Sequence, residues 1–109
     1  MAIVELSVIP IGTNTTSVSK YVAEIYDVLE KEKGVKYQLN PMGTVIEGRL
    51  DDLMRIVREL HEVPFKSGVR RVYTVVKIDD RRDKESHMED KIRSVNEKRK
   101  KISVEKTVF

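Results

Sequence analysis

"YQLNPMGTVIEG", residues 37–48, has the pattern of two short strands joined by a tight turn. Apolar and polar residues alternate on both sides of the turn, and a period of two is typical of strands with one buried face. Pro41 and Gly43 favour the turn, because proline presets its own backbone angle and glycine tolerates tight geometry. The pattern predicts a β-hairpin with strands at residues 35–41 and 44–50.

Each arm of this hairpin is flanked by a predicted helix and a further strand. Before it, residues 17–33 carry the apolar stripe of an amphipathic helix, and residues 3–9 alternate as a strand. After it, Asp51 is a candidate N-cap for a second helix that ends near Pro64, and residues 69–78 alternate as a fourth strand. The order predicts a ferredoxin-like βαββαβ sandwich of the α+β class, in which two helices cover one face of a four-stranded antiparallel sheet.

A third helix is expected after the fourth strand. Residues 86–89, Ser-His-Met-Glu, have the form of a capping box, and a narrow apolar stripe of Met88, Ile92 and Val95 follows. The whole chain of 109 residues is expected to form a single domain. Its last stretch, about 100–109, is expected to be a C-terminal tail or a short edge strand.

The composition excludes several classes of protein. The chain has no cysteine, which excludes disulfides and cysteine-based zinc sites and fits a cytoplasmic location. Its first ten residues include Glu5 within an apolar run and have no basic lead-in, unlike a signal peptide. No apolar run approaches the roughly 20 residues that span a bilayer, so no membrane partner is expected.

The net charge of +3 is concentrated near the C-terminus, where residues 91–106 hold seven Lys or Arg and two Glu. We interpret this surplus as the solvated, basic end of a helix, where cations are favourable. RNA-recognition modules of this fold need aromatic residues on their two central strands for base stacking. The strands at 3–9 and 44–50 have none, so no nucleic-acid partner is expected.

The predicted fold leaves one sheet face without helices, and we call it the open face. It is half apolar and half polar, and such a surface usually marks an interface. We therefore expect sheet-against-sheet self-association into a homodimer, while the alternative is a soluble monomer with a mixed face. The open-face residues are Ile3, Glu5, Ser7, Ile9, Gln38, Asn40, Val45, Glu47, Tyr73, Val75 and Lys77.

The sequence offers few candidates for a metal site or a nucleophile. His61 and His87 are the only histidines; His61 is interpreted as a surface residue, and the capping box already explains Glu89 beside His87. No metal site is therefore expected. No nucleophile elbow and no phosphate-binding glycine loop is present.

Acid–base catalysis would need Glu5 and Glu47 to meet across two strands, where two like charges would raise one pKa. Pairing of each carboxylate with Lys77 or Arg49 is the expected alternative. The charged run KIDDRRDK, residues 77–84, is interpreted as a salt-bridge network between subunits or as a strand terminator.

Three runs occur in order along the chain: VIPIGTNTTSVSKYV (8–22), YQLNPMGTVIEG (37–48) and RVYTVVKIDDRRDKESHMEDKIRSV (71–95). Together they resemble the small thiamine-binding family, whose members are also called YkoF-like or UPF0045-type proteins. The resemblance extends from the first strand through the third helix. It implies ferredoxin-like dimers that pair into homotetramers and bind thiamine or its hydroxymethylpyrimidine moiety, with no reaction of their own and no cofactor.

The resemblance implies a ligand for the polar residues of the hairpin. An aminopyrimidine has a fixed edge of donors and acceptors, so its site needs a few oriented polar groups in an apolar pocket. The candidate ligand-binding residues lie in the hairpin and in the loop that opens the first helix; they are Thr13, Thr16, Ser17, Ser19, Tyr37, Gln38, Asn40, Met42, Thr44 and Glu47.

Most of these candidates also have an ordinary structural role. Tyr37 can belong to the core, Thr16 or Ser17 can cap a helix, and Asn40 can serve the turn. Gln38 and Glu47 can be polar residues of a subunit interface. The alternative function is therefore a structural or regulatory oligomer without a vitamin ligand, and a third is an enzyme acting on a small phosphorylated or pyrimidine substrate.

Overall fold

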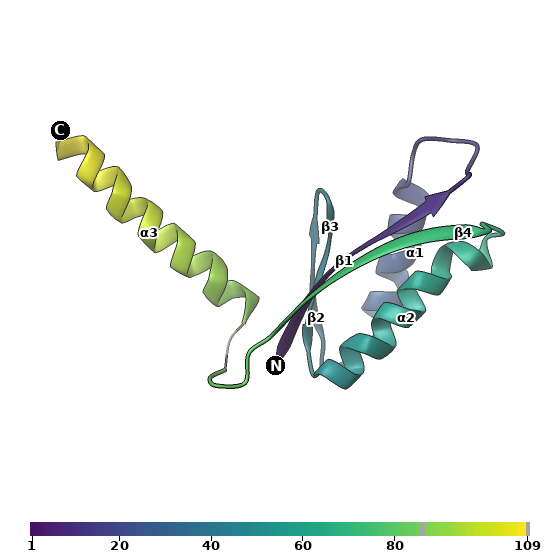
Figure 1. The fold of residues 1–109 in the computed structure, drawn as a ribbon, viewed down its shortest axis with the longest axis horizontal. Coiled ribbons are helices and arrows are strands. Elements are labelled where there is room, and N and C mark those ends of the chain that lie inside the picture. The colour runs from purple at the N-terminus through teal and green to yellow at the C-terminus, as the bar shows by residue number, and fades with distance from the viewer. Residues whose placement is uncertain (86, 109) are drawn as a thin grey trace.

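The computed structural model describes the backbone of residues 1–85 and 87–108, and the side chains of residues 1–85 and 87–99. Its strands are β1 (Ala2–Ile11), β2 (Lys36–Asn40), β3 (Gly43–Gly48) and β4 (Arg71–Asp80), and its helices are α1 (Ser19–Glu30), α2 (Leu50–Lys66) and α3 (Met88–Val108). The strands form one antiparallel sheet in the order β2-β3-β1-β4. Figure 1 shows α1 and α2 on one side of this sheet, while α3 projects away from it.

This arrangement confirms the predicted ferredoxin-like α+β fold. β1 and β2 are joined through α1, with β3 between them in the sheet. β3 and β4 are joined through α2, with β1 between them. The two strands of each strand–helix–strand unit are therefore separated in the sheet by one strand of the other unit. Both helices cover the same face of the central strands β1 and β3 (Figure 1).

The hairpin that suggested the fold forms as predicted. Asn40 pairs with Gly43 across the turn, which leaves Pro41 and Met42 as its two linking residues. The Ser7 hydroxyl of β1 donates to the Met42 carbonyl at 2.8 Å and so fastens the turn to the central strand. The turn is therefore fixed both by its own residues and by the neighbouring strand.

The hydrophobic core lies between the sheet and the pair α1 and α2. Leu29 of α1, Leu60 of α2 and Ile46 of β3 are fully buried there. The second helix contributes an apolar stripe of Leu53, Ile56, Val57 and Leu60, and all four residues are buried. The complete buried cluster is Ala2, Val4, Leu6, Ile25, Leu29, Ile46, Leu53, Ile56, Val57, Leu60 and Val63.

The helix starts differ from the prediction. α1 has Val18 as its N-cap and α2 has Arg49, and neither residue makes a side-chain capping bond. Asp51 lies in the first turn of α2 and is not its cap. Ser17 does not cap α1 either, because its hydroxyl lies 3.0 Å from that of Ser19. The hydroxyls of Thr13, Thr15 and Ser17 make hydrogen bonds within the loop, so the predicted cap of α1 does not form.

α2 also continues past the predicted end at Pro64, which is buried inside its last turn. Proline removes only one helical hydrogen bond, and at this position the remaining turn is closed by three-residue bonds from Ser67 and Gly68. Gly68 has φ of 91°, a left-handed conformation that ends the helix at little cost. The helix therefore ends two residues later than predicted.

The C-terminal segment is helical through Val108, so the short edge strand, one of the two alternatives expected at about 100–109, does not form in residues 100–108. The run NEKRKK at residues 96–101 consists mostly of good helix formers and continues the helix. The predicted capping box depends on Ser86, which lies outside the described residues. Here the His87 amide donates to the Asp90 carboxylate at 3.2 Å. No helix within the described backbone has both the length and the apolarity to cross a membrane.

Candidate functional site

A cavity of about 550 Å³ lies on the open face, between the sheet and the start of α3. We call it the open-face cavity. It contains open-face residues from β1, β2, β3 and β4, and residues from the first turns of α3. Its lining residues are Ile3, Glu5, Gln38, Asn40, Val45, Lys77, Ile78, Asp79, Met88, Lys91 and Ile92.

Two amides give this cavity its hydrogen-bonding groups. Gln38 and Asn40 lie two residues apart on β2, so the strand alternation puts both side chains on the open face. Neither side chain has a hydrogen-bond partner among the described residues. Each amide has both donors and an acceptor, so the pair can read the edge of a heterocycle.

Charged groups of both signs surround the amides. The Glu5 carboxylate lies 3.6 Å from the Lys77 ammonium across the β1–β4 pair. Asp79 at the end of β4 pairs with Lys91 of α3. The expected pairing of Glu5 with Lys77 is thereby confirmed, and the cavity has two acidic and two basic residues in its lining.

Apolar side chains complete the wall. Ile3 and Val45 come from the two central strands, and Met88 and Ile92 come from α3. An apolar cavity with a few oriented polar groups is the usual form of a small-molecule site. The open-face cavity is therefore a candidate small-molecule site.

Glu47 lies beside this cavity and is almost completely buried, at 1% exposure, although no helix of the main layer covers its face. Its cover is the His87 side chain, whose Nδ1 lies 2.6 Å from Glu47 Oε1. Neither Arg49 nor Lys77 pairs with Glu47 in the described part of the chain, so that expectation was wrong. In the sheet Glu47 faces Ile3, whereas Glu5 faces Val45, so the two carboxylates are offset along the strands and do not form the considered acid–base pair.

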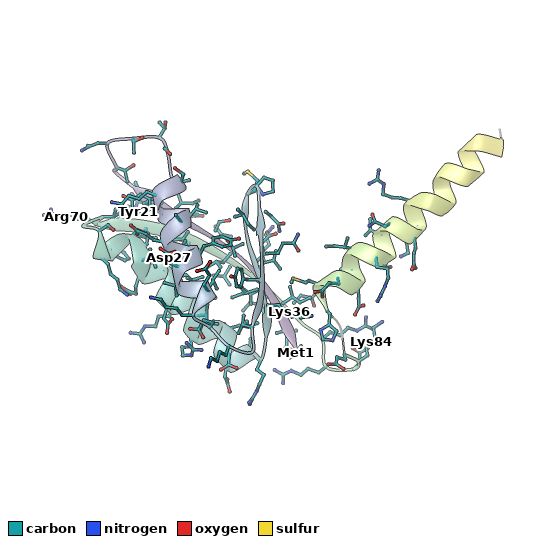
Figure 2. The ribbon with its side chains drawn as sticks, turned by 180° about the vertical axis from the view of Figure 1, so that it is seen from behind. Met1, Tyr21, Asp27, Lys36, Arg70 and Lys84 are labelled. Carbon is teal, nitrogen blue, oxygen red and sulfur yellow. The ribbon has the colours of Figure 1, made fainter. Side chains whose placement is uncertain are left out.

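The predicted hydroxyl residues lie elsewhere. Thr13, Ser17 and Ser19 line a second cavity of about 610 Å³, between the β1–α1 loop and the start of β4. β1 connects the two cavities from Ile3 to Ile11, a span of about 26 Å at the usual strand rise. Figure 2 shows the same separation, with Tyr21 and Arg70 at one end of the domain and Lys36 and Lys84 at the other. Thr16 belongs to this distant, exposed loop as well.

Three further candidates from the hairpin do not line the open-face cavity. Tyr37 points to the helix side, where its ring meets Tyr26 edge-on with centroids 5.6 Å apart. Thr44 is buried on that side too. Burial raises the pKa of Tyr26, whose hydroxyl has no hydrogen-bond partner among the described residues. Met42 is 89% exposed at the tip of the turn.

Several lining residues were not predicted as ligand contacts. Asp79 was read only as part of a charged run, and Lys91 as part of the basic C-terminus. Met88 and Ile92 were predicted to be part of an apolar helix stripe. Because the open face has exposed apolar residues and no helix of its own, it was the surface on which this stripe could have been expected to pack. Within the charged run, Arg82 holds the pKa of the Asp80 carboxyl below its ordinary value through a hydrogen bond.

The histidines do not form a metal site in the described part of the chain, where no group of three or more His, Cys, Asp or Glu residues is arranged to hold an ion. His61 was expected to be a surface residue. It is instead partly buried, with Nδ1 at 2.7 Å from the Thr74 hydroxyl and its ring edge-on to Phe65. Its role is to connect α2 to β4.

Comparison with known proteins agrees with this fold. The sequence model of a family called Thiamine-binding protein matches residues 4–96. The UPF0045 protein YqgV of Bacillus subtilis is 52% identical over 99 residues, which make up 88% of this chain and 95% of the relative.

Solved structures show the same architecture. The crystal structure of the hypothetical protein MJ1052 from Methanocaldococcus jannaschii has a TM-score of 0.78 at 40% identity, over 88% of this chain and 96% of that one. A proposed thiamine biosynthesis or salvage protein from Thermotoga maritima has a TM-score of 0.70 at 20% identity, over 86% and 97% of the two chains. At that identity the second likeness shows the fold alone.

Proposed function

The chain belongs to the thiamine-binding protein family, and from this premise we propose that it binds thiamine or the hydroxymethylpyrimidine moiety of thiamine in the open-face cavity. The observation that carries the proposal is the pair of amides, Gln38 and Asn40, in a largely apolar cavity. An aminopyrimidine presents a ring nitrogen beside an exocyclic amine, and an amide side chain can donate to the first and accept from the second. The flat ring would pack against Val45, Met88 and Ile92.

Charge supports the same assignment. The thiazolium of thiamine is cationic, and Glu5 and Asp79 bring carboxylates to the cavity. Each is paired with an exposed lysine, and an exposed ion pair contributes little stability of its own. A carboxylate can therefore exchange its lysine for the ligand at small cost. We propose a binding protein with no reaction of its own, located in the cytoplasm as the absence of cysteine suggests.

The test is calorimetry with thiamine and with hydroxymethylpyrimidine. The wild-type protein should give saturable heat, and the double variant Gln38→Ala/Asn40→Ala should bind about thirtyfold more weakly, because each lost amide contact removes about 1 kcal/mol. The matched control is Thr13→Ala/Ser17→Ala, which changes two hydroxyls at the other cavity and should bind as tightly as the wild type. Absence of heat with both ligands, in a folded protein, would favour the alternative of a structural or regulatory oligomer.

We also propose that copies of the chain pair through the open face, as homodimers that assemble into homotetramers. Beyond the open-face cavity, Ile9, Tyr73 and Val75 remain exposed on the sheet, with Tyr73 at 57%. On α3, Ile92 and Val95 are about half exposed. Exposed apolar patches of this kind are typical of interfaces.

Light scattering should therefore give two or four times the mass of one chain. Tyr73→Glu/Val75→Glu should reduce the mass to that of a single chain, because it would bury like charges against each other in a symmetric contact. Met54→Glu, an exposed apolar residue on α2 away from the sheet face, serves as the control and should leave the mass unchanged. A wild-type protein with the mass of one chain at all concentrations would contradict this assembly.

A further inference from the structure

We propose that Glu47 and His87 are positioning residues for the open-face cavity: their hydrogen bond holds the start of α3 against the sheet as one wall of the cavity. We call this contact the latch. The role of the wall in ligand binding rests on the proposed function, whereas the latch itself is a property of the unliganded protein.

The burial of Glu47 is the first observation. A carboxylate on the open face would ordinarily remain hydrated, as Glu5 on the neighbouring strand does. Glu47 is instead 1% exposed, and its Oε1 lies 2.6 Å from His87 Nδ1, which is 40 residues away along the chain. Removing a carboxylate from water is costly unless partners compensate for it, and His87 compensates one oxygen only, because Glu47 Oε2 has no hydrogen-bond partner among the described residues. The cover that His87 provides is therefore a specific contact between the segment before α3 and the sheet.

The other charged contacts of α3 with the sheet are exposed. Glu89 lies 3.4 Å from Lys36, with both side chains more than half exposed, and Lys91 pairs with Asp79 at a similarly exposed site. Exposed ion pairs contribute little because water screens them. The far end of His87, Nε2, lies 3.4 Å from the exposed carboxylate of Glu85 in the adjoining loop. Among the described contacts of the His87–α3 segment with the sheet, the latch is thus the one that involves a buried charged group, Glu47.

The position of α3 decides the shape of the cavity. Met88, Lys91 and Ile92 all line it, and they lie within five residues of His87. Beyond this base α3 projects away from the sheet (Figure 1). The described ion pairs between α3 and the sheet lie at Glu89 and Lys91, in the first turns of the helix. An isolated helix is marginally stable in water. Opening the latch would release the wall and allow the base of the helix to fray.

Binding and latching must then be linked. If a ligand contacts the α3 wall, its affinity for the latched state is higher than its affinity for the open state. By thermodynamic reciprocity, the ligand shifts the equilibrium between the open and the latched state by the ratio of these two affinities. Gln38 and Asn40 supply recognition from the sheet, while the latch supplies the opposite wall.

Hydrogen exchange of the unliganded protein tests the latch directly. His87→Ala should speed exchange of the amides of residues 91–95 at least tenfold, because the base of α3 loses its anchor. His87→Asn should restore nearly wild-type exchange, since the Asn amide nitrogen can occupy the position of His Nδ1 and donate to Glu47. Lys36→Ala, which removes only an exposed ion pair of α3, is the matched control and should change exchange less than twofold. Unchanged exchange in His87→Ala would overturn the latch.

Thiamine calorimetry on the same variants tests the wall. His87→Ala should raise the thiamine Kd several-fold, because the wall is no longer held in the position that contacts the ligand, and His87→Asn should recover most of the affinity. Faster exchange with an unchanged Kd would overturn the positioning role. If the wild type binds no thiamine, the proposed function fails, and the exchange rates of the unliganded variants still decide whether the latch exists.

Discussion

Leu60→Ala is expected to lower the free energy of unfolding by about 3 kcal/mol, the largest loss of stability among the changes considered for this protein. Leu60 is fully buried, and it belongs to α2, the helix that contacts β1, β3 and β4. Truncation removes apolar contacts and leaves a cavity that the surrounding sheet cannot fill, because both central strands are fixed by pairing on each side. In a domain of this size the midpoint of thermal unfolding should fall by about 15 °C.

Thermal and urea unfolding would measure this effect at a fixed protein concentration, since any self-association makes the midpoint depend on concentration. Glu62→Ala is the control, because Glu62 lies on the exposed side of the same helix and its replacement should change the stability by less than about 0.5 kcal/mol. Equal losses for Leu60→Ala and Glu62→Ala would mean that α2 does not anchor the core.

Gly43→Ala should cost about 2 kcal/mol, although only a single methyl group is added. A Cβ at this position would lie 3.0 Å from the Leu6 carbonyl oxygen and 3.1 Å from the Ser7 hydroxyl. The Leu6 oxygen belongs to the central strand and cannot move without disturbing the β1–β3 pair. Gly43 does not have a positive φ, so the cost is steric and does not come from backbone strain.

The site should respond to this change as well. Gly43 pairs with Asn40, so a displaced turn shifts one of the two cavity amides and should weaken thiamine binding several-fold. Gly48→Ala is the control on the same strand. There the nearest atoms, at 3.3 and 3.4 Å, belong to the side chains of Leu53 and Val35, which can move aside, so the loss should stay below about 1 kcal/mol. A larger loss for Gly48→Ala than for Gly43→Ala would contradict this explanation.

The amides of the candidate site followed from local pattern. Strand alternation places Gln38 and Asn40 on one face wherever β2 lies in the sheet, and the order of elements leaves that face without α1 and α2. Their location in one cavity is therefore the part of the predicted site that the structure brings together. Their role toward a ligand stays a prediction until binding is measured.

Other residues of the predicted site lie far from the amides, because the length of β1 separates them. The hydroxyls of Thr13 and Ser17 were grouped with the hairpin, yet they line a cavity at the far end of β1. Sequence pattern gives the face of a residue, but the distance between two loops depends on which strands are neighbours and how long they are. Glu47 was assigned to the correct face, while its burial under His87 depended on the path of the chain after β4.

The starts of the helices also differ between what the local sequence predicts and what the structure shows. Asp51 and Ser17 have good local chemistry for capping, but α1 and α2 begin at Ser19 and Leu50, and their N-cap residues, Val18 and Arg49, make no side-chain capping bond. Core packing contributes several kcal/mol per helix and a cap contributes about 1 kcal/mol, so both helices can form without a side-chain cap.

The order of the elements, the buried side of each and the class of fold could be predicted from the sequence, because hydrophobic periodicity and turn chemistry act over a few neighbouring residues. Only the tertiary structure decided that the hydroxyl loop lies away from the amides, that His87 covers Glu47, and that α3 forms a wall of the cavity. The Glu47–His87 contact joins residues 40 positions apart, and its formation depends on where the chain after β4 returns to the sheet, which no local pattern specifies.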